Sequence, residues 1–126
     1  MARILIAEDE EALRALTARA LTDTGHEVVT AVDGADALDI LTREEGRFEL
    51  LLTDIKMPLM DGIALALATA RDYPQIIILL MTAYADQRER ASNLDALIHD
   101  VILKPFTLAE IKTAVAGALT ASKAAP

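Results

Sequence analysis

Five short apolar runs alternate along the chain with longer segments whose apolar residues recur at the spacing of a helix. This alternation is typical of an α/β fold with a parallel sheet. The run at residues 48–53 has little polar alternation, as expected of a strand buried on both faces. Because crossovers between parallel strands are right-handed, we expect a doubly wound five-stranded sheet in the order 2-1-3-4-5.

Apolar periodicity and turn residues set the expected boundaries of these elements. The expected strands cover residues 3–8, 27–32, 48–53, 76–81 and 100–103, and the expected helices cover residues 10–24, 35–45, 62–72, 86–97 and 107–120. We expect a single domain over residues 1–120, followed by a frayed tail at residues 121–126.

For three of the helices, the sequence also predicts either the face that packs on the sheet or the residue that caps the N-terminus. The residues of the first helix expected to face the sheet are Leu13, Leu16, Ala20 and Leu21. Asp61 is a candidate cap for the third helix. Residues 86–89 (Asp-Gln-Arg-Glu) have the form of a capping box for the fourth, with aspartate in place of Ser or Thr.

The composition argues against several classes of protein. The chain has 126 residues, no cysteine and a formal net charge of −8. Disulfides and thiolate metal sites are therefore impossible, and the negative charge argues against unaided nucleic-acid binding. No apolar stretch approaches the roughly 20 residues of a membrane-spanning helix, and the early strand pattern leaves no room for a secretory signal. We expect a cytoplasmic protein that binds neither nucleic acid nor a membrane.

Polar residues follow four of the apolar runs, at the point where each expected strand ends. They are Glu8-Asp9-Glu10, Asp54, Thr82 and Lys104. The carboxyl ends of parallel strands line the edge at which open α/β sheets bind ligands. In the expected order the first and third strands are neighbours, so their acids meet. This arrangement predicts a crevice for a divalent cation and a phosphoryl group.

Asp9 and Asp54 are the candidates for direct ligands of the cation. Mg²⁺ prefers hard oxygen ligands and keeps several waters. Two carboxylates, a backbone carbonyl and waters would serve, with Glu8 or Glu10 holding a water. The alternative is that the acids at residues 8–10 only favour the start of a helix through its dipole. Asp54 on the neighbouring strand favours the metal.

Asp54 is also a candidate nucleophile, because a carboxylate can attack phosphorus and form an acyl phosphate. Lys104 would pair first with Asp54 and later with a phosphoryl oxygen, and the Thr82 hydroxyl would donate to the phosphoryl group. Each residue also has a simpler reading, as a turn aspartate, a solvated lysine and a turn or cap threonine. Their joint placement at strand ends favours the chemical role.

As a set, these residues resemble the response-regulator receiver family, which has the CheY-like, flavodoxin-like fold. The matching segments are Glu8-Asp9, residues 51–58 (LLTDIKMP), Asp61-Gly62, Thr82-Ala83 and Lys104-Pro105-Phe106. The resemblance implies that Asp54 takes a phosphoryl group from a phosphohistidine on a sensor histidine kinase or a histidine phosphotransfer protein. It implies a regulator that assists its own phosphotransfer and dephosphorylation, and not an enzyme.

The resemblance also implies the roles of the other site residues. Magnesium would be held by Asp9, Asp54, the main-chain carbonyl of Lys56 and, through a water, Glu8. Thr82 and Lys104 would contact the phosphoryl oxygens. The bond between Lys104 and Pro105 would be cis, as X-Pro bonds can be in tight turns.

Two positions depart from the family pattern. An aromatic residue that swings inward on activation usually lies three positions before the motif lysine, and that position is Val101 here. Because valine cannot act as the same rotamer switch, either Tyr84 supplies an aromatic gate in its place or this protein couples differently. The usual Gly-Ala before the last strand is replaced by Leu97-Ile98.

No output domain is recognisable, so we expect a monomer whose state is read by a partner protein. The expected reading surface is formed by the fourth helix, the last strand and the fifth helix, and includes Arg88, Arg90, Val101 and Lys112. Residues 2–10 and 51–55 look like those of CpdR-type regulators. That likeness implies an adaptor for ClpXP proteolysis.

Two other functions are compatible with parts of this pattern. A magnesium-dependent phosphatase or phosphotransferase would use Asp54 as its nucleophile, but it would want a second acid nearby, and Lys56 is not one. A flavin-binding module of the same topology is disfavoured by the acids and by the absence of tryptophan.

Overall fold

The structure is a computed structural model that describes residues 2–124 apart from residues 93 and 95. Its strands are β1 (Arg3–Ala7), β2 (Glu27–Ala31), β3 (Leu50–Asp54), β4 (Ile77–Thr82) and β5 (Asp100–Leu103). Its helices are α1 (Glu11–Asp23), α2 (Gly34–Arg43), α3 (Gly62–Asp72), α4 (Ala85–Ser92) and α5 (Leu108–Ala124). All strand pairs are parallel, in the order β2-β1-β3-β4-β5. The predicted strand order is confirmed.

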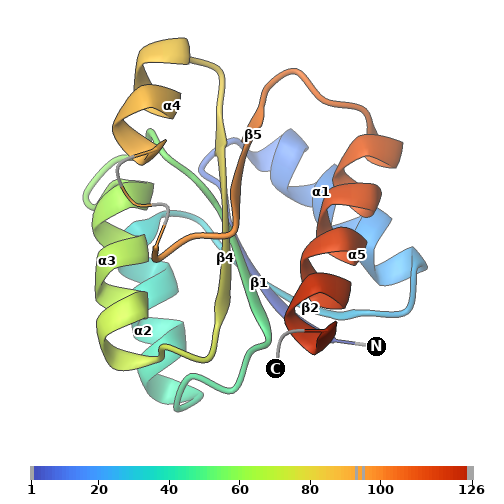
Figure 1. Ribbon diagram of the computed structural model, residues 1–126, viewed down its shortest axis with the longest axis horizontal. Coiled ribbons are helices and arrows are strands. Elements are labelled where there is room, and N and C mark those ends of the chain that lie inside the picture. Colours follow the sequence, from blue (N-terminus) through green and yellow to red (C-terminus); the bar gives the residue numbers. More distant parts are fainter. Residues whose placement is uncertain (1, 93, 95, 125–126) are drawn as a thin grey trace.

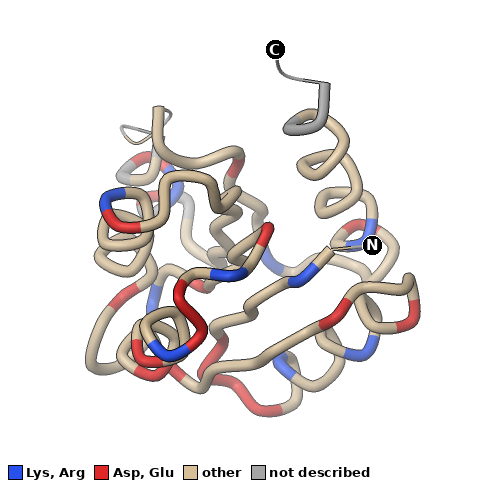
Figure 2. Tube along the Cα trace, turned by 90° about the horizontal axis from the view of Figure 1, so that it is seen from below, with Lys and Arg blue, Asp and Glu red and all other residues tan. Residues whose placement is uncertain are grey.

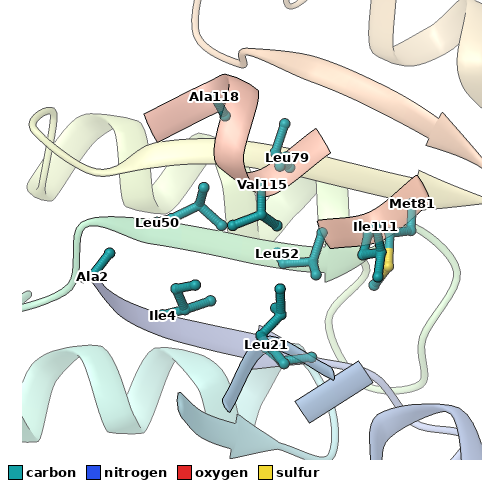
Figure 3. Packing of buried hydrophobic residues seen from close by; sticks show 11 residues of the cluster. Ala2, Ile4, Leu21, Leu50, Leu52, Leu79, Met81, Ile111, Val115 and Ala118 are labelled. Carbon is teal, nitrogen blue, oxygen red and sulfur yellow. The ribbon is translucent and has the colours of Figure 1, made fainter. Parts of the chain in front are cut away.

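Helices cover both faces of the sheet, with α1 and α5 on one face and α2, α3 and α4 on the other (Figure 1). Alternate side chains of each central strand point to opposite faces of the sheet and pack against the helices there. Ile4 and Leu50 pack with Val115 of α5 on the first face (Figure 3), whereas Leu5 and Leu51 pack against α2 and α3 on the second. Burial on both sides explains why these strands read as continuous apolar runs.

The strand register brings the carboxyl ends of the strands level. The paired residues at this edge are Ala7 with Thr53, Asp54 with Met81, and Thr82 with Leu103. Glu8 follows β1 and Lys104 follows β5 directly. The polar residues that the sequence places at strand ends are therefore assembled at one edge, as predicted.

The predicted start of the fourth helix is wrong by one residue. The Arg88 N–H donates to the Tyr84 carbonyl at 3.2 Å, so α4 already begins at Ala85 and Asp86 lies in its first turn. The helix also ends at Ser92 and not at residue 97. Beyond it, the Leu97 N–H closes a turn on the Leu94 carbonyl at 2.7 Å.

Two further boundaries differ from the predictions. The third strand begins at Leu50, because the Phe48 N–H donates to the Gly46 carbonyl at 2.8 Å in a preceding turn. Residues 125–126 of the predicted tail lie outside the described part of the chain, and the last helix continues to Ala124, four residues beyond its predicted end. Alanine is the strongest helix former, and this segment is rich in it.

Two side-chain predictions for the helices have opposite outcomes. The Asp61 carboxylate accepts a hydrogen bond from the Ala64 N–H at 2.8 Å, so the predicted cap of α3 is confirmed. In α1, however, Leu16 is exposed and Thr17 is buried in its place. None of the helices within the described residues is long and apolar enough to cross a membrane.

Candidate functional site

A crevice of about 530 Å³ opens at the carboxyl edge of the sheet. It is lined by Asp9, Glu10, Asp54, Lys56, Met57, Pro58, Ala83, Tyr84 and Lys104. These residues come from the segments that follow β1, β3, β4 and β5. Three of the four predicted strand-end groups thus line this crevice, and the fourth, Thr82, is hydrogen-bonded to the lining residue Tyr84.

Three carboxylates gather at this edge of the sheet, and two of them, Asp9 and Asp54, line the crevice. Glu8, Asp9 and Asp54 offer oxygen atoms that lie within 4.8 Å of one another. Glu8 and Asp54 are buried, whereas Asp9 is exposed. Burial raises the pKa of Asp54, the Lys104 ammonium opposes this shift, and the charge of Asp9 adds to it. Such a cluster of hard, mutually repelling oxygen donors fits a Mg²⁺ ion, which would neutralise their charge.

Lys104 links two of the three acids. Its Nζ donates to Glu8 Oε1 at 2.7 Å and to Asp54 Oδ2 at 3.1 Å. Burial alone would lower the pKa of Lys104, but the hydrogen bonds and charges of the two acids outweigh it, so this pKa is raised. Burial also raises the pKa of Glu8, with Lys104 opposing the shift. A charged ammonium therefore sits beside Asp54.

Tyr84 and Lys56 line the crevice, and the buried Thr82 is hydrogen-bonded to Tyr84. Thr82 is almost fully buried, and its Oγ1 accepts a hydrogen bond from the Tyr84 N–H at 3.1 Å. The Tyr84 ring is half exposed, and the Lys56 ammonium lies 4.9 Å from its centroid, at a cation–π distance.

The loop between β3 and α3 folds back, so that the start of α3 packs against the end of β3. The Gly62 N–H donates to the Ile55 carbonyl at 2.7 Å. A Cβ atom at residue 62 would lie 2.0 Å from the Asp54 carbonyl oxygen, so only glycine fits there without movement. In the same loop, Leu59 has a φ of 68° and is 86% exposed. The peptide bond between Lys104 and Pro105 is cis, as the family resemblance implies.

Arg14 belongs to this region although no role was predicted for it. Its Nη1 donates to the main-chain carbonyl of Glu8 at 2.8 Å. The only signal in the sequence is its position one helical turn beyond the acidic residues 8–10, from which a long side chain can reach back.

Val101 is neither a wall of the crevice nor an exposed residue, so its predicted place on the reading surface is wrong. It is 9% exposed and packs with Ile78, Leu80 and Ala91 in the core beneath α4. The reason is that its side chain lies on the face of the sheet that α3 and α4 cover. Arg88 is exposed and Lys112 is half-buried. The side chain of Arg90 lies outside the described part of the structure.

Comparison with known proteins agrees with this geometry. Residues 4–116 match the family model of the response regulator receiver domain. The transcriptional regulatory protein PrrA of Mycobacterium tuberculosis is 35% identical over 109 residues, which are 86% of this chain and 46% of PrrA. The response regulator MprA of Mycobacterium avium is also 35% identical, over 86% of this chain and 47% of MprA. The chain thus spans about half the length of these relatives.

Solved structures share the fold of this protein over most of its length. A CheY-like receiver domain protein from Methanospirillum hungatei has a TM-score of 0.88 at 28% identity, with 98% of this chain and 97% of that chain covered. The response regulator TrrA from Thermotoga maritima, solved in complex with Mg(2+)-BeF, has a TM-score of 0.82 at 30% identity, with 94% and 99% covered. From its sequence match, its strand order and these structural neighbours, the chain belongs to the family of response regulator receiver domains.

Proposed function

We propose that Asp54 accepts a phosphoryl group from a phosphohistidine on a sensor histidine kinase or a histidine phosphotransfer protein. Receiver domains of two-component regulators are generally phosphoacceptors and not enzymes. The observation that carries the proposal is the position of Asp54. Its carboxylate lies in the crevice, 3.1 Å from the Lys104 ammonium and beside two other acids.

In the proposed transfer, one bond at phosphorus replaces another. A carboxylate oxygen of Asp54 attacks the phosphorus, the P–N bond to the donor imidazole breaks, and the imidazole nitrogen leaves with the bonding electrons. Lys104 already holds Asp54 Oδ2 and is placed to pair with a phosphoryl oxygen. The Thr82 hydroxyl would donate to another.

We assign the proposed Mg²⁺ to Asp9, Asp54 and the main-chain carbonyl of Lys56. When bound, the ion would reduce the repulsion between the carboxylate and the incoming anion. Both Glu8 oxygens already accept hydrogen bonds, from Lys104 at 2.7 Å and from the Glu10 N–H at 3.1 Å. This supports a contact of Glu8 with the ion through a water. The presence of Mg(2+)-BeF in the structure of TrrA also supports the assignment.

Incubation with phosphoramidate and Mg²⁺, followed by intact-mass measurement, tests the phosphoacceptor. The wild type is expected to gain one phosphoryl group, and Asp54→Asn, which keeps the shape but loses the nucleophile, is expected to gain none. Asp39→Asn is the matched control, because Asp39 is exposed on α2, and it should load like the wild type. Normal loading of Asp54→Asn would overturn the assignment. Hydrolysis of a phosphomonoester over many turnovers would favour the alternative phosphatase.

We propose Tyr84 as the gate that relays phosphorylation to α4. The Thr82 hydroxyl can accept from the Tyr84 N–H and donate to a phosphoryl oxygen at once, so a shift of Thr82 would pull the peptide that precedes Ala85. Hydrogen exchange of the α4 amides, measured with and without beryllofluoride, tests this relay. Thr82→Val, which lacks the hydroxyl, should shrink the difference, whereas Tyr84→Phe, which keeps both the N–H and the ring, should preserve it. Equal exchange of the wild type in both states would contradict the relay.

The proposed reader of this change is a partner protein that contacts α4, β5 and α5 of a monomer, with Arg88 and Lys112 among the contact residues. The finer proposal is a CpdR-type output, in which cytoplasmic ClpXP is the reader. It is supported by the likeness of residues 2–10 and 51–55 to those regulators. Binding to purified ClpXP, compared with and without beryllofluoride, tests it. Absence of binding in both states would refute the CpdR-type output while leaving the phosphoacceptor assignment intact.

A further inference from the structure

Three hydrogen bonds fix the main chain of the acidic segment at residues 8–10. The Glu8 N–H donates to the Ala31 carbonyl of β2 at 3.1 Å. The Glu10 N–H donates to Glu8 Oε2 at 3.1 Å. The Glu8 carbonyl, which belongs to the peptide unit that leads into Asp9, accepts from Arg14 Nη1 at 2.8 Å.

Asp9 differs from the other two acids of the cluster. The side chains of Glu8 and Asp54 are buried and are joined by Lys104. Asp9 is exposed, and its carboxylate forms no hydrogen bond or ion pair with the residues that the structure describes. Its position relative to Asp54 is therefore set by the main chain alone.

We propose that Arg14 is a positioning residue for the cation site, because it fixes the peptide unit between Glu8 and Asp9. The inference rests on the proposed function only in requiring a cation at Asp9 and Asp54. Arg14 is half-buried, and its own N–H donates to the Glu10 carbonyl at 2.9 Å, so the base of the side chain is anchored to the same segment. Arg14 is thus held at its main chain by the Glu10 carbonyl and at its guanidinium by the Glu8 carbonyl, and it restrains the one acid of the cluster that lacks side-chain contacts.

Charge and position make opposite predictions for this residue. A guanidinium close to the acids repels a cation, so by charge alone its removal would tighten binding. Loss of the hydrogen bond to Glu8 would let the Asp9 peptide rotate and would weaken binding. Groups that orient metal ligands typically change metal affinity by about 10- to 100-fold when they are removed.

The test is a Mg²⁺ titration of the full, unphosphorylated chain, followed by NMR or calorimetry. Arg14→Met keeps the aliphatic packing but has no donor, and it is expected to weaken Mg²⁺ binding by about tenfold. Arg14→Lys keeps the charge and one donor and is expected to recover part of the loss. Arg19→Ala removes the same charge from an exposed position on the same helix and serves as the control, with unchanged affinity.

The outcomes separate this inference from the proposed function. If the wild type fails to bind Mg²⁺, the proposed site itself is wrong. If the wild type binds but Arg14→Met binds equally or more tightly, the positioning role is wrong and the site stands. Weaker binding by Arg14→Met with an unchanged melting temperature of the metal-free protein would support positioning. If Arg14→Met is poorly folded, a folded Arg14→Lys decides. Weaker Mg²⁺ binding at this unchanged charge would support positioning, and full wild-type affinity would contradict it, because the shorter side chain cannot reproduce the Nη1 contact with the Glu8 carbonyl.

Discussion

Thr17 shows how the packing of α1 overrides residue type. Its side chain is 1% exposed, whereas that of the neighbouring Leu16 is 52% exposed. Apolar periodicity predicted the reverse, because it gives weight to leucine and none to threonine. In the helix, Thr17 shares a face with Ala20 and Leu21, three and four residues further on, and Leu16 falls at the edge of that face.

Replacing this threonine should stabilise the protein. The Thr17 hydroxyl lacks a hydrogen-bond partner within the described structure, and an unsatisfied buried hydroxyl costs about 1–3 kcal/mol. Thr17→Val is nearly isosteric and should raise the free energy of unfolding by about 1 kcal/mol, measured by urea denaturation. Thr22→Val is the control, because the Thr22 hydroxyl is exposed and already donates to the Ala18 carbonyl. A loss of stability in Thr17→Val would mean that the hydroxyl finds a partner in solution.

His26 is a second residue whose environment matters, because its shifted pKa links the stability of the protein to pH. Its Nδ1 accepts a hydrogen bond from the Ala2 N–H at 3.1 Å. Burial lowers the pKa of His26, the N-terminal amine adds to this, and Glu49 opposes it. The folded protein therefore binds a proton at His26 less readily than the unfolded chain, in which the ordinary pKa is about 6.5.

Stability linked to His26 should be complete above this ordinary pKa and should fall as the pH decreases below it. His26→Asn offers a side-chain oxygen in place of Nδ1 and cannot be protonated there. It is expected to lose less stability than the wild type between about pH 7 and pH 5, measured by chemical denaturation. His99→Asn is the control at an exposed histidine. Parallel stability curves for the wild type and His26→Asn would contradict this role.

At the scale of the elements, two glycines of the helices behave oppositely. A Cβ at Gly62, the first residue of α3, would lie 2.0 Å from the Asp54 carbonyl oxygen, whereas Gly117 in α5 faces open space. Gly117→Ala should therefore stabilise the protein by about 1 kcal/mol through helix propensity. Gly62→Ala should destabilise it by about 1–3 kcal/mol and slow the loading of Asp54 by phosphoramidate. Unfolding curves and intact mass measure both effects, and a stable, normally loading Gly62→Ala would show that the loop can move at no cost.

The strand order could be predicted from sequence because it depends on many residues at once. Each central strand is buried on both faces, so its apolar run survives errors at any single position. Boundaries that depend on one hydrogen bond could not be predicted. The Phe48 N–H is engaged in a turn, and the Tyr84 carbonyl starts α4 earlier than the capping pattern suggests.

The residues of the candidate site can likewise be divided into those that could be predicted from sequence and those that could not. Asp54, Thr82 and Lys104 could be placed because strand ends and a regular register fix where they lie. The contact of Arg14 with the Glu8 carbonyl could not be predicted, because it depends on the rotamer of a long side chain and on a main-chain atom that no residue type reveals.

The whole molecule is acidic, with 20 Asp and Glu against 12 Lys and Arg, and both kinds are spread along the trace (Figure 2). The charged side chains at the two ends of β1 are paired differently. At its start, Arg3 pairs with Glu27 and Glu44 and lies 4.4 Å from the centre of the Phe48 ring. At its other end, three acids gather, and Lys104 pairs with two of them, Glu8 and Asp54. At this carboxyl edge of the sheet, one of the three carboxylates, that of Asp9, therefore has no paired cation among the described residues.

This imbalance predicts that Mg²⁺ stabilises the fold. A ligand that binds only the folded state at about 100 times its dissociation constant adds about 2.7 kcal/mol, which for a chain of this size raises the melting temperature by about 10 °C. Calorimetry with MgCl₂, with chelator, and with NaCl at matched ionic strength measures this, and chelator should reverse the shift. Asp9→Asn should melt higher than the wild type without metal, because one repelling charge is gone, and should respond little to Mg²⁺. An equal rise with NaCl would show that general screening, and not a bound cation, relieves the repulsion at this edge.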